Sequence, residues 1–319
     1  MKHNNHQPIC PKCGYDQSGE IATWETQCPI EGVCTECGFE FQWFMILNPV
    51  RGHLRWFVEH SPTRRFTIKS SLLTLWMVLI PNRFWRRVGV ERPVYPRRIW
   101  MWVCLLVMAS YCISVLLGTS IQIIRTDYMN QEYTLMMTQY PQYANQLKAN
   151  LVDMFEFSYW ASVARASIAD PIVMTQSISQ AGLGFCFVLL MTILMWFVVI
   201  CATPVTRQLV KLRLAHISRA MALCLIAPLI VLLTSNVSSG AIIIEGMLRP
   251  PTAVPSQGLE PTLLMLIGVL GAVSLVWVQW FWMAAYIKAW RVRSNLLLAL
   301  AVFTSLLGGF TVFVYMLAY

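Results

Sequence analysis

The sequence predicts an all-α polytopic membrane bundle of five transmembrane helices, preceded by a small cysteine-rich β ribbon at the N-terminus. Two observations favour a membrane protein: 57% of the residues are hydrophobic and only 12% are charged, whereas about 25% are charged in an average soluble protein. The third observation is a group of closely spaced cysteines in a polar head. This composition excludes a disordered chain, a collagen-like chain and a disulfide-rich secreted scaffold.

Five stretches without Asp, Glu, Lys, Arg or His are each long enough to cross a bilayer, whose core of about 30 Å needs roughly 20 helical residues. They are residues 99–124, 182–206, 221–244, 262–287 and 295–319. A soluble helix of this length would show a polar face, whereas these stretches are apolar all round. We therefore expect a membrane domain over residues 99–319, with residues 125–181 as its one long extracytoplasmic loop.

The positions of Lys and Arg predict the orientation of this domain. Residues 1–98 carry 13 Lys or Arg, and the loops 207–219 and 288–293 carry 4 and 3 without any Asp or Glu. The loops 125–181 and 245–261 carry only 3 and 1. We expect a multi-pass protein of a bacterial cell (inner) membrane, with a cytoplasmic N-terminus and an extracytoplasmic C-terminus.

Two Cys-x-x-Cys-Gly motifs lie in the polar head, which we expect to form a cytoplasmic domain over residues 1–47. Two intervening residues let both sulfurs of a motif face one ion, and the glycine leaves room for backbone amides to turn toward the thiolates. Four thiolates at about 2.3 Å form the closed tetrahedral site of a structural zinc ribbon. The cysteines expected to hold one structural Zn²⁺ are Cys10, Cys13, Cys34 and Cys37. Two redox pairs would instead need a βαβ context, which this head lacks.

Three other potential ligands lie near the motifs. The spacing from Cys28 to Cys34 is too wide for a second motif, so we expect Cys28 to stand outside the metal site, with a role as a replacement ligand left open. His3 and His6 lie in the tail before the first motif and have no partner pattern, so we expect them to be solvated.

The charge of the head disfavours nucleic acid as a partner. Residues 1–50 carry two Lys against six Asp or Glu, whereas a nucleic-acid-binding surface is basic. The ribbon is expected to dock either an unknown protein partner or the membrane bundle itself.

Residues 48–98 are expected to form a basic amphipathic juxtamembrane segment. Eleven Lys or Arg lie between residues 51 and 98, against two Glu, and aromatic residues such as Trp56, Trp76 and Trp85 are interleaved with them. This pattern favours helices that lie in the headgroup layer and bind anionic lipids. The alternative, which stays open, is a topology signal without lipid recognition.

We expect no enzyme, because the spans lack the ionisable residues that mark catalysis and ion paths in membranes. No metalloprotease helix motif, aspartate pair or nucleophile elbow is present. The loop 125–181 is expected to form a helical cap, with a substrate-binding lid as the alternative. Gln279 and Asn236 are expected to hydrogen-bond between helices, and the glycines in 268–271 and at 308–309 to let helices approach closely.

The order of motifs resembles a family of uncharacterised bacterial membrane proteins that pair a zinc ribbon with a Yip1-like five-helix membrane domain. The residues that carry the resemblance are Cys10-Pro11-Lys12-Cys13-Gly14-Tyr15-Asp16, Cys34-Thr35-Glu36-Cys37-Gly38-Phe39-Glu40, Phe84-Trp85-Arg86, Pro96-Arg97-Arg98, His216-Ile217-Ser218-Arg219-Ala220 and Trp290-Arg291-Val292-Arg293. The long loop 125–181 departs from the compact Yip1 pattern. The resemblance implies a membrane-organising or interaction role and identifies no ligand.

The function expected from the sequence is that of a non-enzymatic integral membrane protein, whose cytoplasmic zinc ribbon is a structural or protein-interaction module. Three alternatives belong to other classes. An enzyme at the outer face would need acid and base residues brought together from scattered positions that no motif joins: Asp127, Glu132, Asp153, Glu156, Asp170, Glu245 and Glu260. A membrane-tethered nucleic-acid-binding protein would show salt-dependent binding of RNA or DNA. A small-molecule transporter would need a polar cavity at the midplane, which the uncharged spans disfavour.

Overall fold

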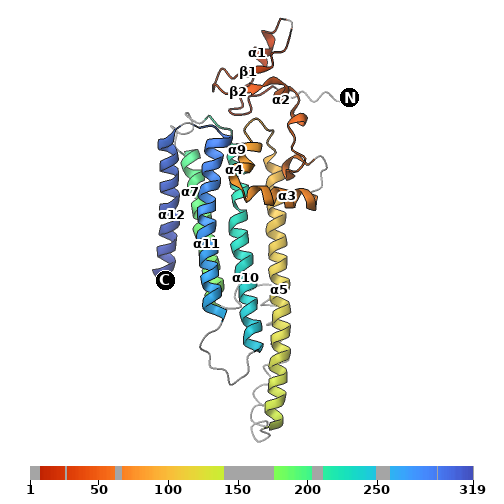
Figure 1. Ribbon diagram of the computed structural model, residues 1–319, viewed down its shortest axis with the longest axis vertical. Helices are drawn as coiled ribbons and strands as arrows, with labels where there is room; N and C mark the ends of the chain where they lie inside the picture. The colour runs from red at the N-terminus through yellow and green to blue at the C-terminus, as the bar shows by residue number, and fades with distance from the viewer. Residues whose placement is uncertain are drawn as a thin grey trace. The chain divides into compact units, whose positions relative to one another are not determined.

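The computed structural model describes residues 8–25, 27–61, 67–139, 176–202, 211–248, 259–292 and 294–318. The described chain is mostly helical, with one small two-stranded sheet near the N-terminus (Figure 1). The elements of the N-terminal third are α1 (Ser18–Ala22), β1 (Glu31–Val33), β2 (Glu40–Gln42), α2 (Trp43–Leu47), η1 (Pro49–Gly52), η2 (Val58–His60), α3 (Ile68–Val78) and α4 (Pro81–Arg87). The elements that follow are α5 (Pro96–Gln139), α7 (Gln176–Ala202), α9 (Leu214–Cys224), α10 (Ile226–Leu248), α11 (Leu259–Ala284), the π-helical turn η3 (Ala285–Ala289) and α12 (Asn295–Ala318).

The chain divides into two compact units. The first consists of Met1–Leu105, Val188–Ala227 and Leu275–Tyr319, and the second of Leu106–Phe187 and Pro228–Ser274. The cysteine motifs, the juxtamembrane segment and the expected basic loops all belong to the first unit.

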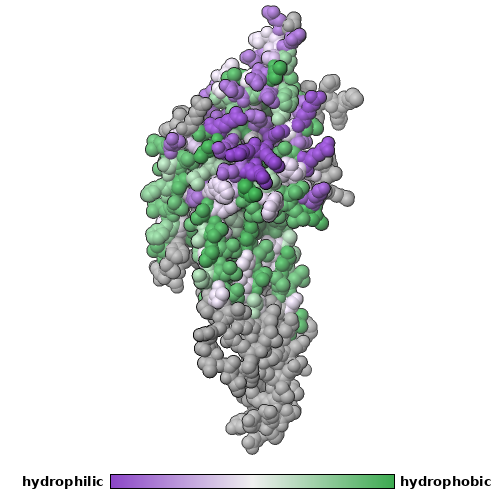
Figure 2. All heavy atoms as spheres, in the orientation of Figure 1, coloured by the Kyte–Doolittle hydropathy of each residue, from purple (hydrophilic) through white to green (hydrophobic). Residues whose placement is uncertain are grey.

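Four helical stretches of the described chain are long and apolar enough to cross a membrane, and they indicate a membrane protein. They are Pro96–Leu117, Ala181–Cys201, Leu214–Ala241 and Thr262–Ala289. Hydrophobic side chains dominate the visible surface of the helices in Figure 2. The fifth expected span, residues 295–319, is helical as α12, but its described apolar part, Asn295–Thr311, is shorter than these four. Five spans are therefore not confirmed.

Two boundaries differ from the sequence prediction. The third candidate span begins at Leu214, within the expected loop 207–219, so it includes His216 and Arg219. Helix α5 continues to Gln139, so the first part of the expected loop 125–181 is helical. The sequence prediction placed each boundary where the uncharged stretch ends. A helix can continue beyond that point, because many polar residues have good helix propensity. The last residues of that loop, 176–181, are helical in α7, and residues 140–175 lie outside the described residues.

Polar side chains link the helices inside each unit, as expected for Gln279 and Asn236. In the first unit the indole nitrogen of Trp196 donates to Oε1 of Gln279 (2.9 Å), and Nε2 of Gln279 donates to Oγ of Ser305 (2.8 Å). In the second unit Nδ2 of Asn236 donates to Oγ of Ser114 (2.7 Å). These hydrogen bonds confirm the helix-linking role expected for both amides. An amide without partners is unfavourable in hydrocarbon.

Close helix approach occurs at two of the expected glycine sites. A Cβ at Gly309 would lie 2.8 Å from Oγ1 of Thr192, and one at Gly271 would lie 2.4 Å from the ring of Phe185. A Cβ at Gly268, by contrast, would meet nothing within 4 Å. The glycine patch at 268–271 thus serves close packing through one of its two glycines.

A buried ion pair joins the juxtamembrane segment to α9. Arg219 and Glu59 are 1% and 0% exposed at their side chains, with Nε of Arg219 2.8 Å from Oε2 of Glu59 and Nη2 3.2 Å from Oε1. Nη2 of Arg219 also donates to the carbonyl of Pro93 (2.6 Å), and the amide of Tyr95 donates to Oε1 of Glu59. Nε and Oε2 face each other at ion-pair distance without a hydrogen bond. The contact of Nη2 with Oε1 and the two backbone partners therefore offset only part of the loss of hydration.

The histidine beside this pair is held neutral. Nε2 of His60 donates to the carbonyl of Pro93 (2.8 Å), and Nδ1 accepts from the amide of Leu54 (3.1 Å). Burial, together with the positive charge of Arg219, lowers the pKa of His60 to about 3. The charge of the cluster therefore rests on Glu59 and Arg219, and not on the imidazole.

We predict that replacing Arg219 alone destabilises the fold strongly. The variant Arg219→Met leaves the carboxylate of Glu59 buried without a counter-charge, so the free energy of unfolding falls by roughly 3–5 kcal/mol. Thermal unfolding of the full chain in detergent, followed by tryptophan fluorescence, measures this loss. The double variant Glu59→Leu/Arg219→Met should recover most of it, because both charges are then removed. A midpoint for Arg219→Met equal to that of a variant at an exposed arginine, Arg97→Met, would contradict the prediction.

Candidate metal centre

The structure brings the four expected cysteines together. One sulfur from each of Cys10, Cys13, Cys34 and Cys37 lies within 4.8 Å of the others. The sulfurs of Cys10 and Cys37 are 3.8 Å apart, and those of Cys13 and Cys34 are 3.6 Å apart. Four sulfurs placed tetrahedrally at about 2.3 Å from one ion are about 3.8 Å apart. The donor set and its spacing therefore fit a tetrahedral metal ion.

The two cysteine loops have the same backbone construction. The amide of Gly14 donates to the carbonyl of Cys10 (2.9 Å), as the amide of Gly38 does to the carbonyl of Cys34 (2.8 Å). Both glycines have a positive φ, +83° and +64°, which a residue with a Cβ adopts at a cost. The glycine of the motif is thus required by the turn that closes each loop.

Short antiparallel pairings flank both loops. Strands β1 and β2 carry the second loop between them, with Gly32 opposite Phe41 in the register. An isolated bridge between Ile9 and Asp16 flanks the first loop in the same way. Edge-to-face contacts of Trp43 with Trp24 and Phe41, at centroid distances of 4.7 and 5.0 Å, form the small core beneath. So small a core gives the ribbon little stability of its own.

The electrostatics of the cluster favour a cation. Burial raises the pKa of the Cys10 thiol well above its usual value, although backbone amides of Cys13 and Lys12 point at the sulfur and oppose the rise. Burial likewise raises the pKa of Cys37 to about 11. At Cys34 burial acts in the same direction, but hydrogen bonds from the backbone of Cys37 and Glu36 bring the pKa below its usual value. A metal ion bound among the four sulfurs would hold them as thiolates.

A buried amide completes the surroundings of the cluster. Gln17 is 1% exposed, and its Nε2 donates to the sulfur of Cys34 (3.3 Å). A hydrogen bond to a metal-bound thiolate lowers the charge on the sulfur and fixes its orientation. No motif around Gln17 signals this role in the sequence.

The other potential ligands do not join the cluster among the described residues. Cys28 is exposed, and its thiol contacts the carbonyl of Pro29 (3.4 Å). His3 and His6 lie outside the described residues. The structure thus leaves Cys28 outside the four-cysteine group, as the spacing predicts.

Residues 211–216, which we call the clasp segment, contact the middle of both cysteine loops. The amide of Arg213 donates to the carbonyl of Lys12 (2.9 Å), and Nε2 of His216 donates to the carbonyl of Pro11 (2.8 Å). Nζ of Lys211 lies 2.9 Å from Oε1 of Glu36 and also contacts its carbonyl. His216 is buried at 2% exposure. The ribbon therefore docks on the beginning of a candidate span through the loops that hold the cysteines.

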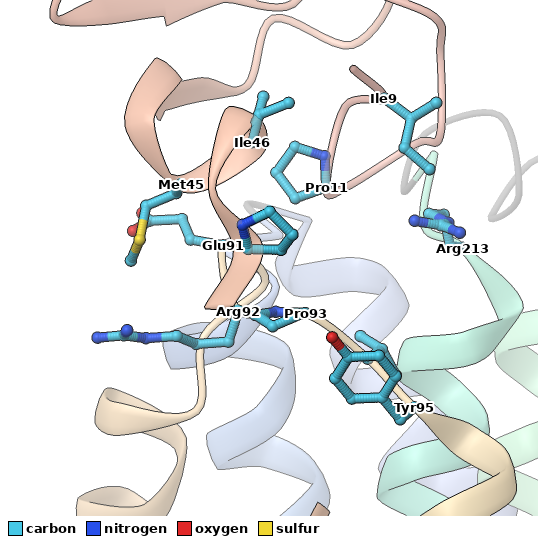
Figure 3. Close-up of a pocket in the computed structure, with 11 residues that line it drawn as sticks. Ile9, Pro11, Met45, Ile46, Glu91, Arg92, Pro93, Tyr95 and Arg213 are labelled. Atoms are coloured by element: carbon cyan, nitrogen blue, oxygen red, sulfur yellow. The ribbon is translucent and has the colours of Figure 1, made fainter. Parts of the chain in front are cut away.

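An open cleft of about 240 Å³ marks the edge of this docked region. Ile9 and Pro11 of the ribbon, Met45 and Ile46 of α2, and the segment 91–95 line it (Figure 3). The guanidinium of Arg92 points out of the cleft and donates to the carbonyl of Gly52 (3.0 Å) (Figure 3). Because its lining is mostly apolar, the cleft is a seam between packed segments.

Comparisons with protein-family models, with curated proteins and with solved structures found no match for this chain. The resemblance to Yip1-like zinc-ribbon membrane proteins therefore stays a prediction.

The sequence prediction missed the residues that hold the ribbon in place. The charge pattern indicates Lys211 and Arg213 only as topology signals, and the order of motifs includes His216 and Arg219 only as residues that enter a span. One signal was available: a histidine and an arginine three residues apart share one face of a helix, and that helix continues into an apolar stretch. Ionisable residues there need buried partners.

We predict one tightly bound metal ion per chain. Cys13→Ser and Cys37→Ser should each remove most of the metal, because each deletes one of four thiolates in a closed site. Cys28→Ser, the matched control, should keep the full complement. Elemental analysis of the purified full chain measures all three. A metal-free wild-type chain, or a Cys28→Ser chain stripped of its metal, would refute the assignment.

Proposed function

We propose that this chain is a non-enzymatic integral membrane protein whose cysteine ribbon holds a structural Zn²⁺ and clamps the cytoplasmic end of its own membrane helices. The ribbon is a docking module, and the surface it docks is the clasp segment of the same chain. The observation that carries the proposal is the set of hydrogen bonds from the clasp segment to Pro11, Lys12 and Glu36, the residues inside the two cysteine loops.

The location of these hydrogen bonds connects docking to metal binding. Pro11 and Lys12 lie between Cys10 and Cys13, and Glu36 lies between Cys34 and Cys37. Their carbonyls point in fixed directions only while both loops keep their shape. A structural zinc site contributes on the order of 10–16 kcal/mol to folding in small ribbons. Metal binding therefore prepares the surface that the clasp segment recognises.

Charge complementarity supports docking within the chain over binding of nucleic acid. The head is acidic, with two Lys against six Asp or Glu in residues 1–50, and the clasp segment pairs Lys211 with Glu36 of the head. A second basic contact comes from Arg291, whose guanidinium lies 5.9 Å from the centre of the Phe39 ring and 3.4 Å from Glu91. The expected cytoplasmic loops supply the positive charge that the ribbon lacks.

The same contacts support a cytoplasmic location for the ribbon. Lys211, Arg213 and Arg291 come from the two basic loops, and both loops meet the N-terminal region inside the first unit. Basic loops mark the cytoplasmic side. Helix α12 has 24 residues, about 36 Å at 1.5 Å per residue, which supports a fifth crossing and an extracytoplasmic C-terminus.

We predict that removing the metal releases the clasp segment. Treatment of the detergent-solubilised full chain with a chelator should raise amide hydrogen exchange in residues 10–38 and also at Arg213, whose amide donates to Lys12. Loss of a hydrogen bond of about 1.4 kcal/mol raises local exchange about tenfold. Hydrogen-exchange mass spectrometry measures both regions in one experiment.

Two histidine variants separate docking from metal binding. His216→Phe should keep the metal but expose the clasp segment, because the Pro11 carbonyl loses its partner. The control His53→Phe removes a histidine that contacts Tyr95 (3.0 Å) and not the ribbon, so it should change neither. Chelation that loosens residues 10–38 but leaves Arg213 protected would mean that the ribbon does not clamp the helices.

The orientation has its own test. A reporter fused before Met1 should be active only in the cytoplasm, and one fused after Tyr319 only outside it, because five crossings place the two ends on opposite sides. Paired fusions to enzymes that work on only one side of the membrane measure this. Activity of both reporters in the cytoplasm would show that α12 does not cross.

A further inference from the structure

Helix α3 exposes an apolar stripe, whereas its buried side combines two polar residues with Met77 and Val78. Ile68, Leu72, Trp76 and Leu79 form a stripe at helical spacing along α3 and just past its end, with exposed fractions of 80, 60, 61 and 43%. Ser70 and Thr74 are buried instead, at 5 and 0%. A helix that packs against a protein in water turns its large apolar side chains toward the core, so an exposed stripe of this size suits apolar surroundings.

Hydrogen bonds from the inward face fix this orientation. Oγ1 of Thr74 accepts from the amide of Val58 (3.0 Å), and Oγ of Ser71 accepts from the indole nitrogen of Trp102 (3.0 Å). Rotating α3 to bury its apolar stripe would break both bonds. These hydrogen bonds therefore hold the apolar stripe of α3 on its outward side.

The position of α3 along the candidate spans is that of an interfacial helix. Trp102 lies six residues into α5, about 9 Å along the axis at 1.5 Å per residue. At the other end of α3, Trp277 of α11 donates to the carbonyl of Leu79 (3.2 Å). Helix α3 has 11 residues and is too short to span. A short helix with an exposed apolar stripe is typical of helices that lie in the membrane interface.

Helix α4 comes directly after α3 and carries three arginines. Arg83, Arg86 and Arg87 are exposed, while Phe84 and Trp85 between them are buried. The spacing i, i+3, i+4 gathers the three guanidinium groups on one face, where with Ile80 and Asn82 they line an open hollow of about 350 Å³. Within the described chain, the ion pairs of the first unit involve other cations. Figure 2 shows hydrophilic side chains gathered around α4 and α9.

We propose that α3 and α4 form a binding site for an anionic phospholipid, with its phosphate at Arg83, Arg86 and Arg87 and its acyl chains against the outward stripe of α3. Guanidinium groups bind phosphate through two parallel hydrogen bonds, and the adjoining apolar stripe matches the rest of the lipid. This site goes beyond the proposed function and does not depend on the ribbon's docking.

The test compares lipid retention by the full chain. Purified wild-type protein is incubated with phosphatidylglycerol or with phosphatidylcholine of the same acyl chains, and bound lipid is counted by native mass spectrometry. We expect wild type to retain phosphatidylglycerol preferentially. The variant R83Q/R86Q/R87Q should bind it about tenfold more weakly or worse, since each Arg near an anionic lipid contributes on the order of one kcal/mol.

A matched variant separates a site from diffuse attraction. R51Q/R55Q/R97Q removes the same charge from three exposed arginines of the same segment and should retain phosphatidylglycerol as wild type does. Equal losses in the two variants, or equal retention of both lipids by wild type, would overturn the proposal. Displacement of the lipid by millimolar inorganic phosphate would also overturn it, because the site would then recognise phosphate alone.

A second measurement needs no variant. Phosphatidylglycerol with a photoactivatable group in its acyl chain is reconstituted with the wild-type chain, illuminated, and the cross-linked peptides are sequenced. We expect cross-links on the outward stripe at Leu72 and Trp76 and none at Thr74. Cross-links confined to the long spans, with α3 unlabelled, would contradict the placement of the stripe in the bilayer.

Discussion

The buried pair of Glu59 and Arg219 is the interaction on which the first unit depends. Each charge alone would be costly to remove from water, and each is held by the other and by backbone groups. The partners come from three separate segments: η2 supplies Glu59, residues 93–95 supply a carbonyl and an amide, and α9 supplies Arg219. Forming the pair therefore requires the juxtamembrane segment, the start of α5 and the start of α9 to meet in one arrangement.

The cysteine ribbon acts on the same helix as this pair. His216 and Arg219 lie three residues apart on α9, so they share one face; the first contacts the ribbon and the second contacts Glu59. Just before the helix, Lys211 has a φ of 41°, a backbone conformation that costs about a kcal/mol or more outside glycine. Its contact with Glu36 offsets that cost. Docking of the ribbon and pairing of the charges thus stabilise the same position of α9.

The parts of the fold that a local pattern specifies could be predicted from the sequence. Four of the five apolar stretches are candidate spans in the structure, because their length and lack of charge are visible in the sequence. The spacing of the cysteines likewise predicted which four sulfurs lie together. The pairings between distant segments could not be predicted, because nothing local to Glu59 indicates an arginine 160 residues away. The outward direction of the apolar stripe of α3 could not be predicted for a related reason. The stretch is short and apolar, and only the hydrogen bonds from Trp102 to Ser71 and from Val58 to Thr74 show which side faces out.

The distribution of specific polar contacts differs along the helices. Away from the ends, the described helices of the first unit are joined by neutral groups, such as the set of Trp196, Gln279 and Ser305. Charged contacts concentrate where the helices begin, at Arg219, Lys211 and Arg291. In a bilayer this division is expected, because neutral hydrogen bonds tolerate hydrocarbon whereas charges require water, headgroups or a buried counter-charge. Glu59 supplies that counter-charge to Arg219, the one arginine that is fully buried among the described residues. The specific charged contacts of the first unit therefore lie near the beginnings of its helices, the same region that the ribbon contacts.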